Sequence, residues 1–343
     1  MIPAATRPSA GRPPGVESPG PVDVLGLPSV SIIIPARNEE GTLTALLDSL
    51  ATLDYPRDRL EIIVVDHKST DRTCEIAAGY GAGVIAYRGD TIAGARNDGA
   101  KAASGTLLAF VDADCTVTPD WLKRAIPYFA DPHVGAAGSY YTIPEDSTTW
   151  VRRVLRLQTQ ALPERGRAEW LPAGNLIVRR DVFWASGTFD RTLTTCEDVD
   201  LCVRIARTHT LINDRQIRCL HHGEPRTLRE LFRKELWRGR DNFLGVFRHG
   251  ISPRELPSVL LPLYFVVVLG LLMTSPILGS LTGWGTAAVT GGSLGAALLP
   301  LLGAAGVICA RGKEVRQFPA VVMVAACYLL ARGLAPIRSW RHV

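Results

Sequence analysis

The chain has 343 residues, 47 % of them hydrophobic, which is enough to bury a sizeable core and excludes a chain that is disordered throughout. Its formal net charge of +5 is modest and the basic residues form no continuous stripe, so nucleic acid is not an expected partner. Seven cysteines without a CxxC pair indicate reduced thiols in a cytosolic compartment and argue against a zinc site.

The N-terminal 29 residues carry seven prolines and no apolar core of the kind that signal peptides have. We expect residues 1–29 to form a disordered arm. Nothing in this segment directs the domain that follows out of the cytoplasm.

From Val30 to about Leu220, short apolar runs alternate with helical patterns. "VSIII" precedes a helix with leucines at i, i+3, i+4 and i+7, and "EIIVV" precedes a second helix from about Asp71. Further strands are expected at "LLAFV" and "NLIVRR", and a later helix has an expected inner face of Val199, Cys202, Val203 and Ala206. The βαβα order predicts an α/β fold with an open, mostly parallel sheet over residues 30–225.

Residues 256–310 contain no Asp, Glu, Lys or Arg. A stretch of this length predicts two transmembrane helices with a turn near "GSLTGWG", the alternative being a buried helical hairpin of a soluble protein. Basic residues flank it on both sides, including Arg248, Arg254 and Lys313, so both flanks are expected in the cytosol. This predicts a multi-pass protein of the inner (plasma) membrane with a cytoplasmic catalytic domain.

Two neighbouring segments complete the expected membrane domain of residues 256–336. A third apolar run starts at Phe318; it either crosses the bilayer or lies at its interface, and the pattern slightly favours a crossing that extends to about Pro336. Residues 226–250 read as an amphipathic basic helix, either interfacial, with Trp237 at the bilayer surface, or packed as an ordinary surface helix. Its position before a membrane span favours the interface.

Polar and acidic residues follow three of the expected strands, at the point where each strand ends. "VSIII" is followed by Pro35 to Glu39, "EIIVV" by Asp66, and "LLAFV" by Asp112 and Asp114. Ligands bind at the carboxyl ends of strands in open α/β sheets. Each residue alone could belong to a turn, but together they predict a cleft.

Asp112 and Asp114 are two positions apart, so on extended backbone their side chains leave the same face and can share one cation. Mg²⁺ or Mn²⁺ takes few carboxylates and keeps positions for phosphate oxygens, and it would neutralise the charge on a departing diphosphate. The alternative is a helix-capping pair before "TPDWL". Cys115, next in the chain, is expected to be a small packing residue.

Three further candidates each have a plainer alternative. Glu197 and Asp198 stand at the start of a helix. They either cap the helix or provide a carboxylate that accepts a proton from an attacking hydroxyl. His221 and His222 end an apolar run, where one of them is a candidate metal or phosphate ligand, although a histidine is more often structural. Arg96, on a helix of small residues, is either a fork donor to a diphosphate or a surface arginine.

In their order and spacing, these motifs resemble family 2 glycosyltransferases with a nucleotide-diphospho-sugar transferase (GT-A) fold. The resemblance covers about Val30 to His222 and rests on "SIIIPARNEE", "IIVVDHKSTDRT", "GARNDGAKAASGTLLAFVDADC", "PAGNLIVRRDVFWASGTFD" and "CEDVDLCVRIAR". The added hairpin resembles bacterial members that act on lipid-linked or membrane-proximal acceptors.

The resemblance implies a role for each matching residue. The segment Pro35, Ala36, Arg37 and Glu39 would line the nucleotide pocket, Asp66 would contact the base, usually uracil, and Arg96 remains a donor-side candidate. Asp112 and Asp114 match the metal-binding DxD signature, and His221 or His222 resembles a late histidine that completes the metal site. Asp198 matches the catalytic base, with Glu197 beside it, while Gly174 and Asn175 match the loop of the sugar and acceptor pocket.

The sequence departs from the family pattern in two places. Many members read VVDDGSTD where this chain reads "VVDHKSTD", so His67 replaces an acid and Lys68 a glycine, which puts the nucleotide preference in doubt. Processive synthases carry a Q(Q/R)xRW motif, but here the place reads "RKELWRG" with Leu236 before Trp237, which argues against polymerisation.

These features predict an inverting, metal-dependent, non-processive glycosyltransferase. It would move a sugar from a nucleotide-diphospho-sugar, with UDP-sugars favoured, to a lipid-linked or membrane-proximal hydroxyl, using Mg²⁺ or Mn²⁺. Two alternatives stay open. One is a polyprenyl-phosphate sugar synthase, whose phosphate acceptor needs no strong base, and the other is a non-catalytic membrane scaffold, against which the intact set of acids argues.

Overall fold

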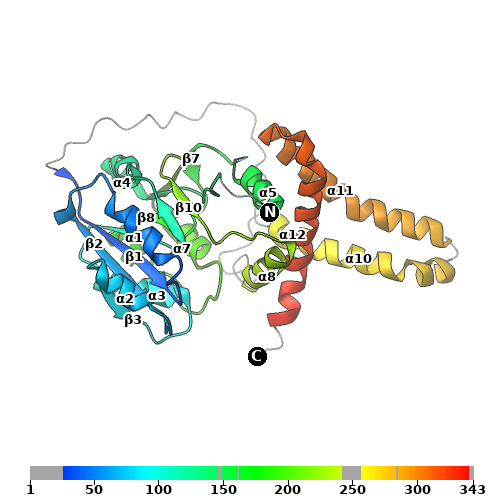
Figure 1. Cartoon of the computed structure of the whole chain (residues 1–343). Coiled ribbons are helices and arrows are strands. Elements are labelled where there is room, and N and C mark those ends of the chain that lie inside the picture. The colour runs from blue at the N-terminus through cyan, green and yellow to red at the C-terminus, as the bar shows by residue number, and fades with distance from the viewer. Residues whose placement is uncertain (1–25, 146–148, 161, 242–255, 283–284, 340–343) are drawn as a thin grey trace. The chain divides into compact units, whose positions relative to one another are not determined.

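The computed structural model describes residues 26–145, 149–160, 162–241, 256–282 and 285–339 (Figure 1). Beyond the first 25 residues, the chain divides into two compact units. The sheet unit comprises residues up to 145 together with 163–224, and the helical unit comprises 146–162 and 225–343. Most of the expected Pro-rich arm, and the part of the expected basic helix after residue 241, lie outside the described residues.

The sheet unit is built on an eight-stranded sheet with the strand order β3-β2-β1-β4-β8-β6-β9-β7. A separate two-stranded sheet pairs β5 with β10. The strands are β1 Val30–Ala36, β2 Leu60–Asp66, β3 Gly83–Ala86, β4 Leu107–Val111, β5 Cys115–Val117, β6 Val134–Gly138, β7 Arg165–Ala168, β8 Asn175–Arg179, β9 Thr210–Asp214 and β10 Cys219–His221.

Helices cover both faces of this sheet, so its central strands are apolar on both sides. Along β1, Ile32 and Ile34 pack into the core on the side of helix α1, while Ile33 between them packs into the opposite core with α3. The helices of this unit are α1 Leu43–Ala51, α2 Thr73–Gly79, α3 Ile92–Ala102, α4 Trp121–Ala125, α6 Arg180–Ala185 and α7 Glu197–Ile205, with 3-10 turns at Arg57–Arg59 and Ile126–Ala130. The predicted leucine stripe of α1 is fully buried.

The sheet is mostly parallel, as the sequence predicts, but β8 runs antiparallel between β4 and β6, and β7 antiparallel to β9. Because β8 is reversed, its first residue, Asn175, pairs with Val111 at the end of β4. The start of β8 therefore lies at the same sheet edge as the carboxyl ends of the parallel strands.

Of the expected inner face of α7, Cys202 is buried as predicted, but Val199 and Val203 are only half-buried. The structure buries Leu201, Cys202 and Ile205, while Ala206 is exposed. Glu197 is also buried, and Glu197, Leu201 and Ile205 are spaced four residues apart, so the acid at the first turn lies on the same face as the core residues. The apolar residues alone do not show how α7 is rotated about its axis, because the buried face also contains an acid.

The helical unit contains α5 Trp150–Gln160, α8 Leu228–Arg238, α10 Leu256–Thr282, α11 Thr286–Gly312 and α12 Phe318–Ser339, with a 3-10 turn at Val315–Gln317. Three segments, Leu256–Thr282, Thr286–Gly312 and Val315–Pro336, are long and apolar enough to cross a membrane. Many of their large apolar side chains are exposed, such as Met273 at 84 % and Leu281 at 77 %. Exposed apolar surface of this kind is what lipid covers.

Helix α5 lies within the range 30–225 that the sequence assigns to the sheet domain, but it packs in the helical unit. Val154 and Leu157 of α5 join a buried cluster with Leu231 of α8 and with residues of α11 and α12. Helix α8 begins with a capping box: the Thr227 hydroxyl accepts the Glu230 amide at 3.2 Å, and the Glu230 carboxylate accepts the Arg226 amide at 2.7 Å.

Candidate active site

The carboxyl edge of the parallel strands gathers most of the residues that the sequence singled out. The loop after β1 carries Arg37 and Glu39, β2 ends at Asp66, and Asp112 and Asp114 follow β4. The start of β8 joins them from the opposite direction along the chain. All of these residues belong to the sheet unit.

Arg96 of α3 connects two of the acids. Its Nη2 lies 2.6 Å from Asp112 Oδ1 and its Nη1 lies 2.6 Å from Glu197 Oε1. The arginine is only 3 % exposed, so it is not the surface arginine of the alternative, and both of its Nη atoms are bonded to carboxylates. Burial alone would lower the pKa of Arg96, but the two carboxylates outweigh it and raise the pKa.

Asp112 receives a second donor from Tyr141. The tyrosine hydroxyl donates to Asp112 Oδ2 at 2.8 Å and accepts the Gly174 amide at 3.1 Å. Burial would raise the pKa of Asp112, but Arg96, His221 and the Tyr141 hydroxyl outweigh it and lower the pKa, so the carboxylate is ionised. A Cβ on Gly174 would lie 2.3 Å from both Asp112 Oδ2 and the Tyr141 oxygen, so a larger residue here would displace these two side chains.

Asn175 forms hydrogen bonds with several residues around the site. Its side chain is fully buried, accepts from Trp121 Nε1 at 2.8 Å, and donates to the carbonyl oxygens of Ser139 and Ile217. With these bonds made, Asn175 holds the surrounding loops together.

The first turn of α7 presents Glu197 and Asp198. Asp198 accepts the amides of Val199 at 2.9 Å and Ala173 at 3.3 Å, and it is partly exposed. Burial raises the pKa of both acids; for Glu197, burial and the charge of Asp198 outweigh the pairing with Arg96 and raise the pKa to about 7. Glu197 is therefore held by Arg96, while Asp198 combines a raised pKa with access to solvent.

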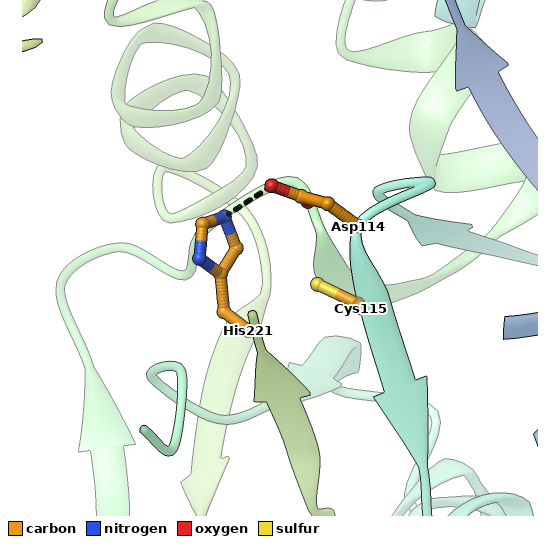
Figure 2. A group of neighbouring side chains, drawn as sticks. All are labelled: Asp114, Cys115 and His221. Carbon is orange, nitrogen blue, oxygen red and sulfur yellow. Dashed lines mark ion pairs between the residues drawn. The ribbon is translucent and has the colours of Figure 1, made fainter. Parts of the chain in front are cut away.

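Asp114 lies beside His221, as Figure 2 shows. His221 Nε2 is 3.4 Å from Asp114 Oδ2, and His221 Nδ1 is 3.4 Å from Glu224 Oε1. The Cys115 sulfur belongs to the same group, whose ligand atoms all lie within 4.8 Å of one another. Gly223 passes close by, since a Cβ there would lie 1.9 Å from Asp114 Oδ2.

A carboxylate and an imidazole are suitable donors for Mn²⁺ and leave positions for other oxygen ligands. Glu224 Oε1, 3.4 Å from Nδ1, places a second carboxylate beside the same imidazole. Burial raises the pKa of the Cys115 thiol well above its ordinary value, so the neutral thiol is a poorer donor and its packing role stands. Asp114 and His221 thus fit a divalent cation.

The two adjacent histidines are placed differently. His221 is buried beside Asp114. His222 is exposed, its ring nitrogen Nε2 lies 2.9 Å from the Thr116 hydroxyl, and its backbone amide donates to the Asp114 carbonyl oxygen at 2.9 Å. The structure therefore brings His221, and not the ring of His222, to the candidate metal group.

Residues 31–187 match the family described as Glycosyl transferase family 2. Residues 31–187 therefore belong to a family 2 glycosyltransferase domain. The matched range includes the loops after β1, β2 and β4, together with Arg96 and Gly174.

Curated relatives of this glycosyltransferase domain are about 30 % identical to it over the aligned residues. A beta-monoglucosyldiacylglycerol synthase of Synechocystis is 29 % identical over 202 residues, covering 54 % of this chain and 42 % of the relative. The glycosyltransferase AglE of Haloferax volcanii is 31 % identical over 181 residues, covering 50 % of this chain and 60 % of the relative. The chain thus spans about half the length of the curated relatives it matches.

Among solved structures, the fold resembles the mannosyltransferase PcManGT of Pyrobaculum calidifontis, determined in complex with GDP-Man and Mn²⁺. The TM-score is 0.59 at 22 % identity, and the similarity covers 94 % of this chain and 90 % of the other. This confirms the GT-A fold class.

The loops after β1 and β2 of the glycosyltransferase domain are bonded to each other. The Asn38 amide donates to the Ser69 hydroxyl at 2.9 Å, and the Thr70 amide donates to Asn38 Oδ1 at 2.8 Å. Asp66 lies behind them, 9 % exposed, accepting the Ser69 amide at 3.3 Å. Within β1, Pro35 and Ala36 are buried strand residues, and Ala36 pairs with Asp66 in register.

Glu39 and Arg37 occupy the same loop differently. Glu39 is half-buried and bonded to the Thr42 hydroxyl, and burial raises its pKa. Arg37 is exposed.

The two residues that depart from the family pattern both contact the loop before α3. His67 Nε2 lies 2.9 Å from the Gly89 carbonyl oxygen, and Lys68 Nζ lies 3.0 Å from Asp90 Oδ1. Lys68 also has a φ of 59°, a left-handed conformation that favours glycine, the residue usual there. The substitutions therefore link the loop after β2 to the loop after β3.

Tyr141 and Glu224 were not singled out from the sequence. Tyr141 follows β6, which runs parallel to β9 and ends at the same edge as β4, so a polar residue after the run "VGAAGS" is a signal of the kind used for Asp66. Glu224 follows two histidines in a loop, and nothing in its local pattern indicates that it faces His221.

Proposed function

We propose that this chain is an inverting, metal-dependent, non-processive glycosyltransferase that transfers a sugar from a nucleotide-diphospho-sugar to the hydroxyl of a lipid-linked or membrane-proximal acceptor. The observation that carries the proposal is the connection of Asp112 to Glu197 through Arg96, with Asp198 next to Glu197. This connection joins Asp112, on the expected side of the sugar donor, to Glu197 and Asp198, on the expected side of the acceptor, within one network of side chains.

Asp198 is the proposed general base. It would accept the proton of the acceptor hydroxyl as that oxygen attacks C1 of the donor sugar in a single displacement. Its two backbone amide donors orient the carboxylate, and its raised pKa brings it closer to the working pH. Glu197 would position the base and the acceptor side through its ion pair with Arg96.

Asp114 and His221 are the proposed holders of the cation, Mg²⁺ or Mn²⁺, which when bound would neutralise charge on the departing nucleoside diphosphate. Asp112, kept ionised by Arg96 and Tyr141, would orient the donor beside it. The Gly174 amide fixes the Tyr141 hydroxyl that in turn donates to Asp112. Asp66 and the segment from Pro35 to Glu39 are proposed to line the nucleotide pocket.

The acceptor class is supported by the apolar helices and by the relatives. A Synechocystis relative is named as a synthase of monoglucosyldiacylglycerol, and a Myxococcus xanthus relative as an O-antigen biosynthesis protein. The basic residues on both flanks of the α10–α11 hairpin support an inner-membrane protein with its catalytic domain in the cytoplasm. Protease added to spheroplasts should therefore leave the sheet unit uncut.

A donor screen tests the reaction. Full-length protein in detergent is offered UDP- and GDP-sugars with Mn²⁺ or Mg²⁺ and a lipid extract, and release of nucleoside diphosphate is measured. We expect release with a subset of donors, UDP-sugars first, and loss of release after chelation of the metal. Absence of release from every donor would overturn the enzyme proposal.

The Asp198→Asn variant tests the mechanism. We expect turnover to fall by about 100-fold or more while donor binding is retained, because only the proton acceptor is lost. Asp181→Asn is the matched control, since Asp181 accepts the amide of the next residue in α6 at 2.9 Å just as Asp198 does in α7. Substantial activity of Asp198→Asn would instead favour a phosphate acceptor, as in a polyprenyl-phosphate sugar synthase.

A further inference from the structure

The apolar helix α12 has the length and composition of a third membrane span, but its contacts within the helical unit are not those of a span. We propose that α12 lies in the interfacial layer of the membrane together with α8, and that only α10 and α11 cross the bilayer. The proposed partner of the α8–α12 pair is thus the headgroup region of the lipid surface.

Helix α12 contacts α8 at several points along its length. Three contacts follow one another in the same direction along both helices. The Cys327 sulfur donates to the Leu228 carbonyl oxygen at 3.4 Å, and Arg332 Nε donates to Glu235 Oε2 at 2.8 Å. Further on, a Cβ on Gly239 would lie 2.6 Å from the Ala335 Cβ. The two helices therefore run side by side over most of α8.

Helix α8 cannot lie in hydrocarbon. Its eleven residues include six ionisable ones, namely Arg229, Glu230, Arg233, Lys234, Glu235 and Arg238. Each such side chain is costly at the centre of a bilayer. Since α8 must stay outside the hydrocarbon layer, the stretch of α12 from residue 327 to 335 that accompanies it stays outside as well.

The remaining part of α12 is too short to cross. Residues 318–326 precede the stretch that accompanies α8. At ~1.5 Å per residue they would cover ~14 Å, about half of a hydrocarbon layer of ~30 Å. Leu231 of α8 also packs in one cluster with Val321 and Val324, so α8 reaches this part of α12 too.

Helix α12 packs against only part of the hairpin that α10 and α11 form. Figure 1 shows α12 running across the base of the hairpin that α10 and α11 form. Some buried clusters include residues of α12. Among the described residues, the members of these clusters that belong to α10 lie between Leu261 and Leu269, and those that belong to α11 lie between Ala296 and Cys309. A third span of similar length would pack along the whole hairpin. Instead, the distant half of α10 carries Met273, Ile277 and Leu281, which are 63 % to 84 % exposed.

The surroundings of α12 suit the interfacial layer. Arg332 lies within α12, paired with Glu235 and stacked on Tyr328 at 5.3 Å from the ring centroid. Trp237 of α8 is 43 % exposed, and tryptophan is enriched at the level of the headgroups. Amphipathic helices that are rich in arginine and lysine lie in this layer.

The two ends of the full-length chain provide the test. A hairpin followed by an in-plane helix returns the C-terminus to the side of the N-terminus, whereas a third span would place it on the opposite side. Epitope tags are attached at Met1 and at Val343 of the otherwise unchanged chain, and their exposure to protease is compared in sealed spheroplasts and in inverted vesicles. We expect both tags to become accessible in the same preparation.

Accessibility of the two tags in opposite preparations would overturn the proposal. The comparison is independent of the absolute orientation and of the enzymatic reaction, so its failure would leave the proposed function standing. An internal reference is a tag placed after Thr282, between α10 and α11, which should be accessible in the preparation opposite to that of Met1.

Discussion

Arg96 is the residue on which the candidate site depends most directly. It is buried, and the carboxylates of half-buried Asp112 and buried Glu197 each lie 2.6 Å from one of its terminal nitrogens. A planar guanidinium can hold two carboxylates at fixed angles, which a lysine ammonium cannot. Arg96 therefore keeps the charge of two acids in balance and sets their relative positions.

We expect Arg96→Lys to fold but to lose about 100-fold in kcat, with a smaller change in the KM for the donor, because misplacement of a catalytic group by about 1 Å has this effect. Arg96→Met, which leaves the buried Glu197 and the half-buried Asp112 carboxylates without their cation, should unfold more easily by about 3–5 kcal/mol. Kinetics and thermal unfolding in detergent measure the two effects.

Arg191→Lys is the control for these variants, since Arg191 pairs with Asp98 at the protein surface. It should leave kcat and stability close to those of the unchanged protein. An Arg96→Lys variant with unaltered kcat would contradict a positioning role for Arg96.

His221 and His222 form a natural pair for testing the cation site. His221→Ala should weaken Mn²⁺-dependent binding of UDP or GDP by at least about 10-fold, because a ligand beside Asp114 is removed. His222→Ala should change this binding little, since the His222 ring faces Thr116. Calorimetric titration with and without Mn²⁺ measures both. Equal losses in the two variants would indicate a general disturbance of the loop.

At the scale of secondary structure elements, Glu235 joins α8 to α12. It is 4 % exposed and pairs with Arg332 at 2.8 Å and with Arg238 at 2.9 Å. Burial alone would raise the pKa of Glu235, but the two arginines outweigh it and lower the pKa to about 2. Folding therefore favours the ionised carboxylate.

This shift makes the stability of the helical unit depend on pH. A carboxylate whose pKa falls from an ordinary 4.5 to about 2 contributes stability above pH 4.5 that is lost as the pH falls towards 2. The contribution is about 3 kcal/mol, at about 1.4 kcal/mol for each unit of pKa. Glu235→Gln should lower the unfolding temperature in detergent at pH 7, and the difference from the unchanged protein should shrink below pH 4.5.

Glu314→Gln serves as the control for Glu235→Gln because Glu314 is exposed in the same unit. It should leave the unfolding temperature unchanged at either pH. A difference between Glu235→Gln and the unchanged protein that stays constant with pH would show that the lost stability does not come from the charge.

At the scale of the whole molecule, the chain combines a sheet unit of residues up to 145 and 163–224 with a helical unit that includes α5 from the middle of the sequence. The chain thus enters the helical unit at α5, returns to complete the sheet with β7, β8 and β9, and enters it again at α8. The helical unit is therefore assembled from two separate parts of the chain.

The fold class and most of the elements of the candidate site could be predicted from the sequence because they depend on local patterns. The apolar pattern of "VSIII" and of the leucines after it predicts that these residues are buried, and Asp66 and Asp112 indicate where a strand ends. The reversal of β8 and the phase of α7 could not be predicted, because the first depends on which strands become neighbours and the second on Glu197 turning towards Arg96.

By itself, the sequence determined the α/β class, the motifs of a family 2 glycosyltransferase and the positions of the long apolar helices, all of which follow from the order and periodicity of neighbouring residues. Only the tertiary structure decided that Arg96 bridges Asp112 and Glu197, that His221 rather than the His222 ring meets Asp114, and that α12 runs beside the charged helix α8. The physical reason is the same in each case. The free energy of a buried charge or of an apolar helix depends on the groups packed against it, and those groups come from distant parts of the chain.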